Sequence, residues 1–263
     1  MITFRVAVTR DEGADGDLTR AVRAAGLEPV RCPAVATLPP RDVEPVTHAA
    51  RTLHSYDWLI AASARAVAAL VEARAGEPLP SNLRTAAVGG HTAAALARAG
   101  AREVLIAPEP GAAALADRLR EADAWPGRRV LLPRAEEGRT EIASTLRGLG
   151  ARVEDVVTYR TVARLAADIV EDWQAARPDA AIVASPSAAG ALVYALGTRT
   201  LAELAVVVAI GRTTASRLET LGVRCEVSPD AGFEPAAACV KRVLARAEAR
   251  AAVAGPRGAG GWR

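Results

Sequence analysis

Small and hydroxyl-bearing side chains follow short apolar runs at several points, each directly before a stretch with helical periodicity. Ser63 in "DWLIAASARAVAAL" and Ser185 in "DAAIVASPSAAGAL" are two examples. Backbone N–H groups at a helix start attract anions, and a hydroxyl group there adds a donor. These positions therefore predict carboxylate or phosphate binding, although a serine or threonine there can also simply cap its helix. The set comprises Thr9, Arg10, Ser63, residues 89–92, Arg134, residues 185–187 and residues 211–214.

Other chemistries find little support in the sequence. The GxGxxG, GxxxxGK[ST] and GxSxG motifs are all absent. The histidines lack metal-ligand spacing, and Glu136 and Glu137 are typical of a solvated loop. The three cysteines have no CxxC spacing, which favours reduced, buried thiols over a disulfide frame or a zinc site. We therefore expect neither a metal nor a cofactor. The residues concerned are His48, His54, His91, Cys32, Cys225 and Cys239.

Length and composition indicate a globular protein of two domains, each with a hydrophobic core. The chain has 263 residues, of which 51% are apolar and 24% charged. A net charge of +3 without a basic patch argues against nucleic acid. No apolar run is long enough to cross a bilayer, and no signal peptide precedes the first strand pattern. We expect a cytoplasmic protein.

An internal repeat runs through the chain. The two segments quoted above begin at Asp57 and Asp179, an offset of 122 residues. The same offset aligns residues 86–102 with 208–224, and an offset of 124 aligns residues 6–10 with 130–134. Three matched pairs in the same order indicate a duplication in which each copy takes about half the chain.

The repeated unit predicts the fold class. Each unit is an apolar run, typical of a strand buried on both faces, followed by a helical stretch that usually ends at glycine. This alternation predicts parallel sheets in two similar doubly wound, flavodoxin- or Rossmann-like α/β domains. Residues 28–40 and 152–163 are extended without a following helix, so they are the predicted linkers. Two linkers mean that the chain leaves one domain and later returns to it.

Six motifs in register resemble the uroporphyrinogen-III synthase family, over roughly residues 3–245. They are "YDWLIAASARAVAAL", "VGGHTAAAL", "VLLPRAEEGR", "VVTYRTV", "IVASPSAAGAL" and "VVAIGRTTASRLETLG". The resemblance implies two similar α/β domains joined by a two-stranded linker. Domain one would take residues 1–36 plus 163–250, and domain two residues 37–162. The composition of residues 251–263 separately predicts a disordered tail.

The resemblance also implies a function, that of a cofactor-free lyase of heme and tetrapyrrole biosynthesis. The enzyme would cyclise hydroxymethylbilane, which has eight carboxylate arms, to uroporphyrinogen III, with inversion of ring D and loss of water. Helix N-termini in a cleft between the domains would hold the arms. We expect a monomer that makes at most transient contact with hydroxymethylbilane synthase.

The resemblance further assigns roles to individual residues. Tyr159 would help the hydroxyl group leave. The predicted substrate-binding residues are Ser63, Thr92, Ser185, Ser187, Thr213, Thr214, Arg10 and Arg134. Two positions depart from the family pattern. Ala62 stands where a threonine is frequent, and Arg212 stands where proline is common.

Two alternatives remain at this point. One is an inactive relative that binds a tetrapyrrole or another polyanion for regulation, but the presence of Tyr159 and the hydroxyl positions favours the enzyme. The other is a two-lobed small-molecule receptor, which would fit the two linkers but predicts a secretion signal.

Overall fold

The chain divides into two compact units. The computed structural model describes residues 3–254 except 108, 110, 139 and 231. Unit 1 comprises Met1–Ala36 and Val162–Arg263, and unit 2 comprises Thr37–Thr161. The central strands of both sheets pair in parallel, so the expected α/β fold with parallel sheets is confirmed. Within the described residues, no helix is both long and apolar enough to cross a membrane.

The sheet of unit 1 has the flavodoxin strand order. Its five strands are arranged β11-β10-β9-β1-β2, which is 2-1-3-4-5 when the strands are counted along the unit. The order therefore reverses between β1 and β9. The strands are β1 (Arg5–Val8), β2 (Glu28–Arg31), β9 (Ala180–Val183), β10 (Val206–Ala209) and β11 (Glu226–Val227).

The sheet of unit 2 repeats this arrangement. Its order is β3-β8-β7-β4-β5-β6, and the repeat makes β6-β5-β4-β7-β8 equivalent to β11-β10-β9-β1-β2. The order therefore reverses between β4 and β7. Both β3 and β8 cross a boundary between the units, and they are neighbours in this sheet. The strands are β3 (Val35–Leu38), β4 (Trp58–Ala61), β5 (Arg84–Ala87), β6 (Val104–Ile106), β7 (Arg129–Ala135) and β8 (Arg152–Ala163).

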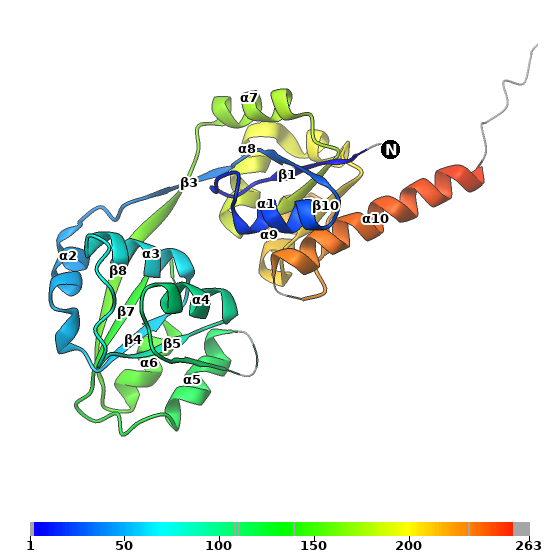
Figure 1. Cartoon of the computed structure of the whole chain (residues 1–263). Helices are drawn as coiled ribbons and strands as arrows, with labels where there is room; N and C mark the ends of the chain where they lie inside the picture. Colours follow the sequence, from blue (N-terminus) through cyan, green and yellow to red (C-terminus); the bar gives the residue numbers. More distant parts are fainter. Residues whose placement is uncertain (1–2, 108, 110, 139, 231, 255–263) are drawn as a thin grey trace, which may run out of the picture. The chain divides into compact units, whose positions relative to one another are not determined.

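Helices cover both faces of the sheet in unit 1. Alternate residues of the central strands enter two separate cores, as the pleat of a strand requires. The first core packs against α7 (Ala166–Ala176), α8 (Pro186–Ala202) and α9 (Arg212–Thr220). The second packs against α1 (Asp17–Ala24) and α10 (Phe233–Ala254), which lie side by side in Figure 1.

Unit 2 is layered in the same way. One core packs against α2 (Glu44–Arg51), α3 (Ala64–Ala73) and α4 (Gly90–Arg98), with a short 3-10 helix at Leu53–Ser55. The opposite core packs against α5 (Ala112–Arg120) and α6 (Glu141–Gly148). All four residues of β4, β9 and β10 are buried, as predicted for strands covered on both faces.

The aspartates at the start of the repeated segments hold the strands at which the order reverses. Asp57 Oδ2 accepts the backbone N–H of Arg129 at 2.8 Å, and the Asp57 N–H donates to the Arg129 carbonyl at 2.9 Å. Asp179 makes the same two bonds with Arg5, each at 2.8 Å. The aspartates that the two copies share are therefore structural.

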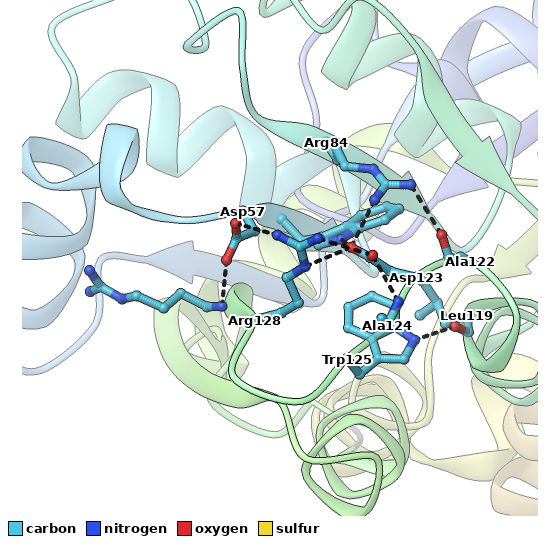
Figure 2. Close-up of polar contacts among 10 residues, drawn as sticks. Asp57, Arg84, Leu119, Ala122, Asp123, Ala124, Trp125 and Arg128 are labelled. Carbon is cyan, nitrogen blue, oxygen red and sulfur yellow. Dashed lines mark hydrogen bonds and ion pairs between the residues drawn. The ribbon is translucent and has the colours of Figure 1, made fainter.

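Another structural carboxylate, that of Asp123, lies near the amino ends of β4 and β5 in unit 2 (Figure 2). Its side chain is only 8% exposed. Arg84 and the Trp58 indole donate to Oδ2 at 2.7 and 2.9 Å, and Arg128 lies 3.1 Å away. The Ala124 N–H donates to Oδ1 at 2.8 Å. This cluster joins the start of β4 and β5 to the segment before β7.

Two sequence-based expectations need correction. Residues 251–254, predicted to begin a disordered tail, belong to α10, because the helical pattern of that segment continues to Ala254. The rest of the predicted tail, 255–263, lies outside the described residues. Cys32 and Cys239 are buried free thiols, but Cys225 is only partly buried because it lies just before the exposed edge strand β11. Burial raises the pKa of Cys32 to about 12, which keeps that thiol protonated.

Gly150 follows α6 and lies close to the backbone of Pro126. Gly150 and Gly127 have left-handed φ values of +89° and +81°. A Cβ atom on Gly150 would lie 3.2 Å from the Pro126 Cα atom, whereas one on Gly127 would meet nothing within 4 Å. We predict that Gly127→Ala costs about 1 kcal/mol of unfolding free energy and Gly150→Ala about 2 to 3 kcal/mol. Urea unfolding monitored by tryptophan fluorescence measures both; equal losses would show that the backbone contact is unimportant.

Candidate active site

A β-bulge shapes the carboxyl end of the unit 2 sheet. Arg134 of β7 pairs with Val157 of β8, but the next residue, Ala135, pairs with Tyr159. Thr158 is the extra residue, and its buried hydroxyl donates to the Arg134 carbonyl at 3.2 Å. Bulges of this kind redirect the side chains that follow them. The bulge therefore sets the direction of Tyr159 at the end of the sheet where ligands of doubly wound folds bind.

Tyr159 contacts Ser63, which lies 96 residues away in the chain. Ser63 follows β4 as the N-cap of α3, and its Oγ accepts the Ala66 N–H at 3.1 Å. The same Oγ lies 3.2 Å from the Tyr159 Oη. Two residues predicted separately for the site thus meet where the strand order reverses in unit 2.

Arg65 joins this pair and was missed by the sequence analysis. Its guanidinium carbon lies 5.9 Å from the centre of the Tyr159 ring, within the range of a cation–π interaction. Arg65 is half-buried in the first turn of α3. The signal available in the sequence was its position two residues after Ser63, but that spacing says nothing about Tyr159.

The capping interpretation is confirmed for the serines and wrong for the threonines. Ser185 caps α8 as Ser63 caps α3, by accepting the Ala188 N–H at 3.1 Å. The N-caps of α4 and α9 are instead Gly89 and Gly211, neither of which makes a side-chain cap bond. Thr92 and Thr214 lie one turn further on, where their side chains are only 6% and 3% exposed. The first-turn N–H groups of α4 and α9 therefore receive no side-chain cap from the N-cap residue.

Among the predicted binding residues of unit 1, Ser187 and Thr213 are the exposed ones. The Ser187 Oγ lies 2.9 Å from the Ser185 Oγ, and both Ser187 and Thr213 are exposed. Close by, the end of β10 and the first turn of α9 border a hollow of about 670 Å³. Its lining includes Gly211, Arg212, Ser216, Ser228 and Asp230.

The two repeat-related arginines are engaged within their own units. Arg10 Nε lies 3.2 Å from Glu12, and its guanidinium is 4.7 Å from the centre of the Phe233 ring. Arg134 Nε donates to Asp155 at 2.5 Å, and Nη1 donates to two backbone carbonyls at 2.7 Å. These partners hold the guanidinium groups in place, so substrate contact by Arg10 and Arg134 stays a prediction.

No constellation for a metal ion appears in the described part of the chain. Groups of three or more His, Cys, Asp and Glu side chains with suitable spacing do not occur there. His48 and His54 are exposed, on α2 and just after it. His91 lies exposed in the first turn of α4 beside Thr92.

Comparison with known proteins decides the family. The family model described as uroporphyrinogen-III synthase HemD matches residues 16–237. The chain belongs to this family. A curated uroporphyrinogen-III synthase from Synechococcus elongatus is 32% identical over 167 residues, which are 61% of this chain and 62% of that protein. The match therefore spans less than two thirds of the relative.

Solved uroporphyrinogen-III synthases share the fold. The Helicobacter pylori structure aligns with a TM-score of 0.60 at 18% identity, covering 93% of this chain and all of that one. A mutant Thermus thermophilus structure aligns with a TM-score of 0.57 at 20% identity, with the same coverage. Apart from Arg10, every predicted site residue lies inside the region matched by the uroporphyrinogen-III synthase family.

Proposed function

We propose that this chain cyclises hydroxymethylbilane to uroporphyrinogen III, as a lyase that eliminates water. Family membership supports the substrate and the reaction. The observation that carries the proposal within the molecule is the Tyr159 hydroxyl, 3.2 Å from Ser63 at the carboxyl end of the unit 2 sheet. That edge, where the strand order reverses, is the usual ligand site of doubly wound folds.

Tyr159 supplies the proton for the leaving group. Its phenol donates to the hydroxymethyl oxygen, the carbon–oxygen bond breaks, and water leaves. The carbon of ring D that already carries the methylene bridge to ring C attacks the resulting cation, which gives a spiro intermediate. The bridge bond to that carbon then breaks and re-forms at the free α-carbon of ring D, so that the ring is inverted. Closure releases a proton from the pyrrole carbon, which returns to the phenolate, so that the phenol is regenerated without net proton uptake. General acid catalysis of this kind contributes about 10²- to 10⁴-fold.

Binding rests on carboxylate contacts from each unit. The N–H groups at the starts of α4 and α9 act as donors for acetate and propionate arms, and the exposed Ser187 and Thr213 add hydroxyl groups. Thr92 and Thr214 lie in the first turns of these two helices, and Ser185 caps the start of α8. Carboxylate arms held at fixed points restrict the substrate to a single closing geometry, which can be worth about 7–11 kcal/mol in favourable cases.

The direct test is the isomer formed in a coupled assay. Porphobilinogen and hydroxymethylbilane synthase generate the substrate in situ, and chromatography of the oxidised products separates isomers I and III. Mainly isomer III is expected. Isomer I alone, from folded protein, would contradict the proposal and indicate an inactive binding protein. The family match does not favour that alternative. The cytoplasmic location, the monomeric state and a transient contact with hydroxymethylbilane synthase stay predictions.

Arg212 should strengthen substrate binding. It is exposed in the first turn of α9, and no ion-pair partner for it occurs among the described residues. A guanidinium there adds a charged donor to the helix start. We predict that Arg212→Ala raises KM about fivefold and leaves kcat nearly unchanged, since one exposed ion pair is worth about 1 kcal/mol. Arg217→Ala, at the far end of the same helix, is the control; equal changes in KM would indicate a general charge effect.

A further inference from the structure

The Tyr159 phenol has two neighbours at the start of α3, the N-cap residue and a residue of the first turn. Its oxygen meets Ser63 and its ring lies under Arg65, so both neighbours come from one short segment of the first helical turn. The three side chains are all half-buried. Their geometry restricts where the phenol can point and which groups surround its oxygen.

The hydrogen-bond inventory of Ser63 sets the direction of the contact during proton transfer. A serine hydroxyl has one proton to donate and two acceptor positions, and the Ala66 N–H occupies one of these positions. Before transfer, either oxygen of the Ser63–Tyr159 pair can be the donor. Once Tyr159 has given up its proton it can only accept, so Ser63 must then donate to it. A hydrogen bond to an anionic oxygen is stronger than the neutral one it replaces.

Arg65 acts in the same direction. A guanidinium over the ring attracts the neutral π-system weakly, and it attracts the negative charge of a phenolate more strongly because the interaction becomes one between opposite charges. Both contacts therefore gain strength as the proton leaves Tyr159. Interactions that strengthen on the way to the transition state raise kcat, whereas those equal in both states change KM.

We propose that Ser63 and Arg65 are positioning residues for Tyr159, rather than residues whose main task is to bind the substrate. The proposal rests on the proposed function. Ser63 holds the phenol oxygen and donates to it as charge develops, while Arg65 stabilises the same charge from above the ring. This differs from the sequence-based expectation for Ser63, which grouped it with the substrate-binding hydroxyls.

The experiment compares steady-state kinetics of isomer III formation for variants of both residues. Ser63→Ala should lower kcat on the order of tenfold, with KM within about twofold. Ser63→Thr keeps the cap and the hydroxyl and should retain most of kcat. Ser63→Asp also caps a helix, so its thermal stability should match the wild type, but its carboxylate cannot donate and repels a phenolate, so kcat falls.

Arg65 is tested with matched variants. Arg65→Gln should lower kcat about fivefold and Arg65→Lys less, because lysine keeps the charge without the planar group. Repeating Ser63→Ala and Arg65→Gln in the Tyr159→Phe background gives a double-mutant cycle. If both residues act through the phenol, each change should there alter kcat by less than about twofold.

The possible outcomes separate this inference from the proposed function. The inference would be overturned if Ser63→Ala or Arg65→Gln lowered kcat as much in the Tyr159→Phe background as in the wild type. It would also be overturned if either variant raised KM and left kcat unchanged. In both cases the residue would be a substrate contact. A Tyr159→Phe variant with wild-type kcat would also overturn the inference while leaving the synthase activity intact. Formation of isomer I alone by the wild-type protein would instead contradict the proposed function before any variant is made.

Discussion

Replacing Tyr159 with phenylalanine is expected to lower kcat for isomer III by about 100-fold while changing KM by less than about threefold. The variant keeps the ring beneath Arg65 but loses the hydroxyl that lies 3.2 Å from Ser63. Because the substrate closes spontaneously to isomer I, the loss should appear as a shift in the isomer ratio. Chromatography of the oxidised products at several substrate concentrations gives both constants.

Tyr56→Phe is the matched control for this experiment. Tyr56 is buried, and its phenol donates to Glu154 at 2.5 Å. Glu154 lies on β8, as Tyr159 does, but away from the carboxyl end of the sheet. Burial and the bond to Glu154 raise the pKa of Tyr56 to about 12, so this phenol keeps its proton at neutral pH. Its removal should lower stability and leave kcat unchanged. A similar fall in kcat for both variants would mean that β8 transmits a structural effect.

Removal of the Asp123 carboxylate is expected to destabilise unit 2 by about 3 kcal/mol. Asp123→Ala leaves the Trp58 indole N–H without its acceptor, and it leaves Arg84 and Arg128 without a carboxylate they share. Figure 2 shows the two guanidinium groups turned toward this one side chain. Urea unfolding monitored by tryptophan fluorescence includes this region, since the Trp58 indole donates to Asp123 and the Trp58 and Trp125 rings are 5.3 Å apart.

The pH dependence gives a second measure of the same cluster. Burial by itself raises the pKa of a carboxyl group, but hydrogen bonds and the two arginine charges outweigh it and lower the pKa of Asp123 below 3.8. A lowered pKa contributes stability that is present above the unfolded value and is lost as the pH falls through the folded value. The stability difference between wild type and Asp123→Asn should therefore be constant near neutrality and shrink below about pH 4.

Asp117→Ala serves as the control for Asp123. Its carboxylate pairs with Arg120 at 3.5 Å but is 80% exposed, so its loss should cost less than about 0.5 kcal/mol at any pH. Equal losses for the two aspartates would show that the Asp123 cluster stabilises no more than a surface ion pair.

Local features of the fold were predictable because they depend on neighbours in the chain. The buried strands and the serine caps follow from apolar runs and from a hydroxyl at a helix start, both of which are visible within about ten residues. The failure at Thr92 and Thr214 is also local. A glycine in front of each helix takes the N-cap position, and glycine is itself a common N-cap residue, so each threonine falls inside its helix.

By itself, the sequence determined the repeated strand–helix unit, the parallel α/β class and the set of polar residues at the strand ends. Only the tertiary structure decided which of these residues meet. Ser63 and Tyr159 are 96 residues apart, and their contact depends on β7 lying between β4 and β8 and on a bulge at Thr158. Likewise, the position of Arg65 over the Tyr159 ring and the ring of donors around Asp123 arise from strands that are distant in sequence. The physical reason is that strand order and register bring side chains together, whereas periodicity records only which face of its own element each residue occupies.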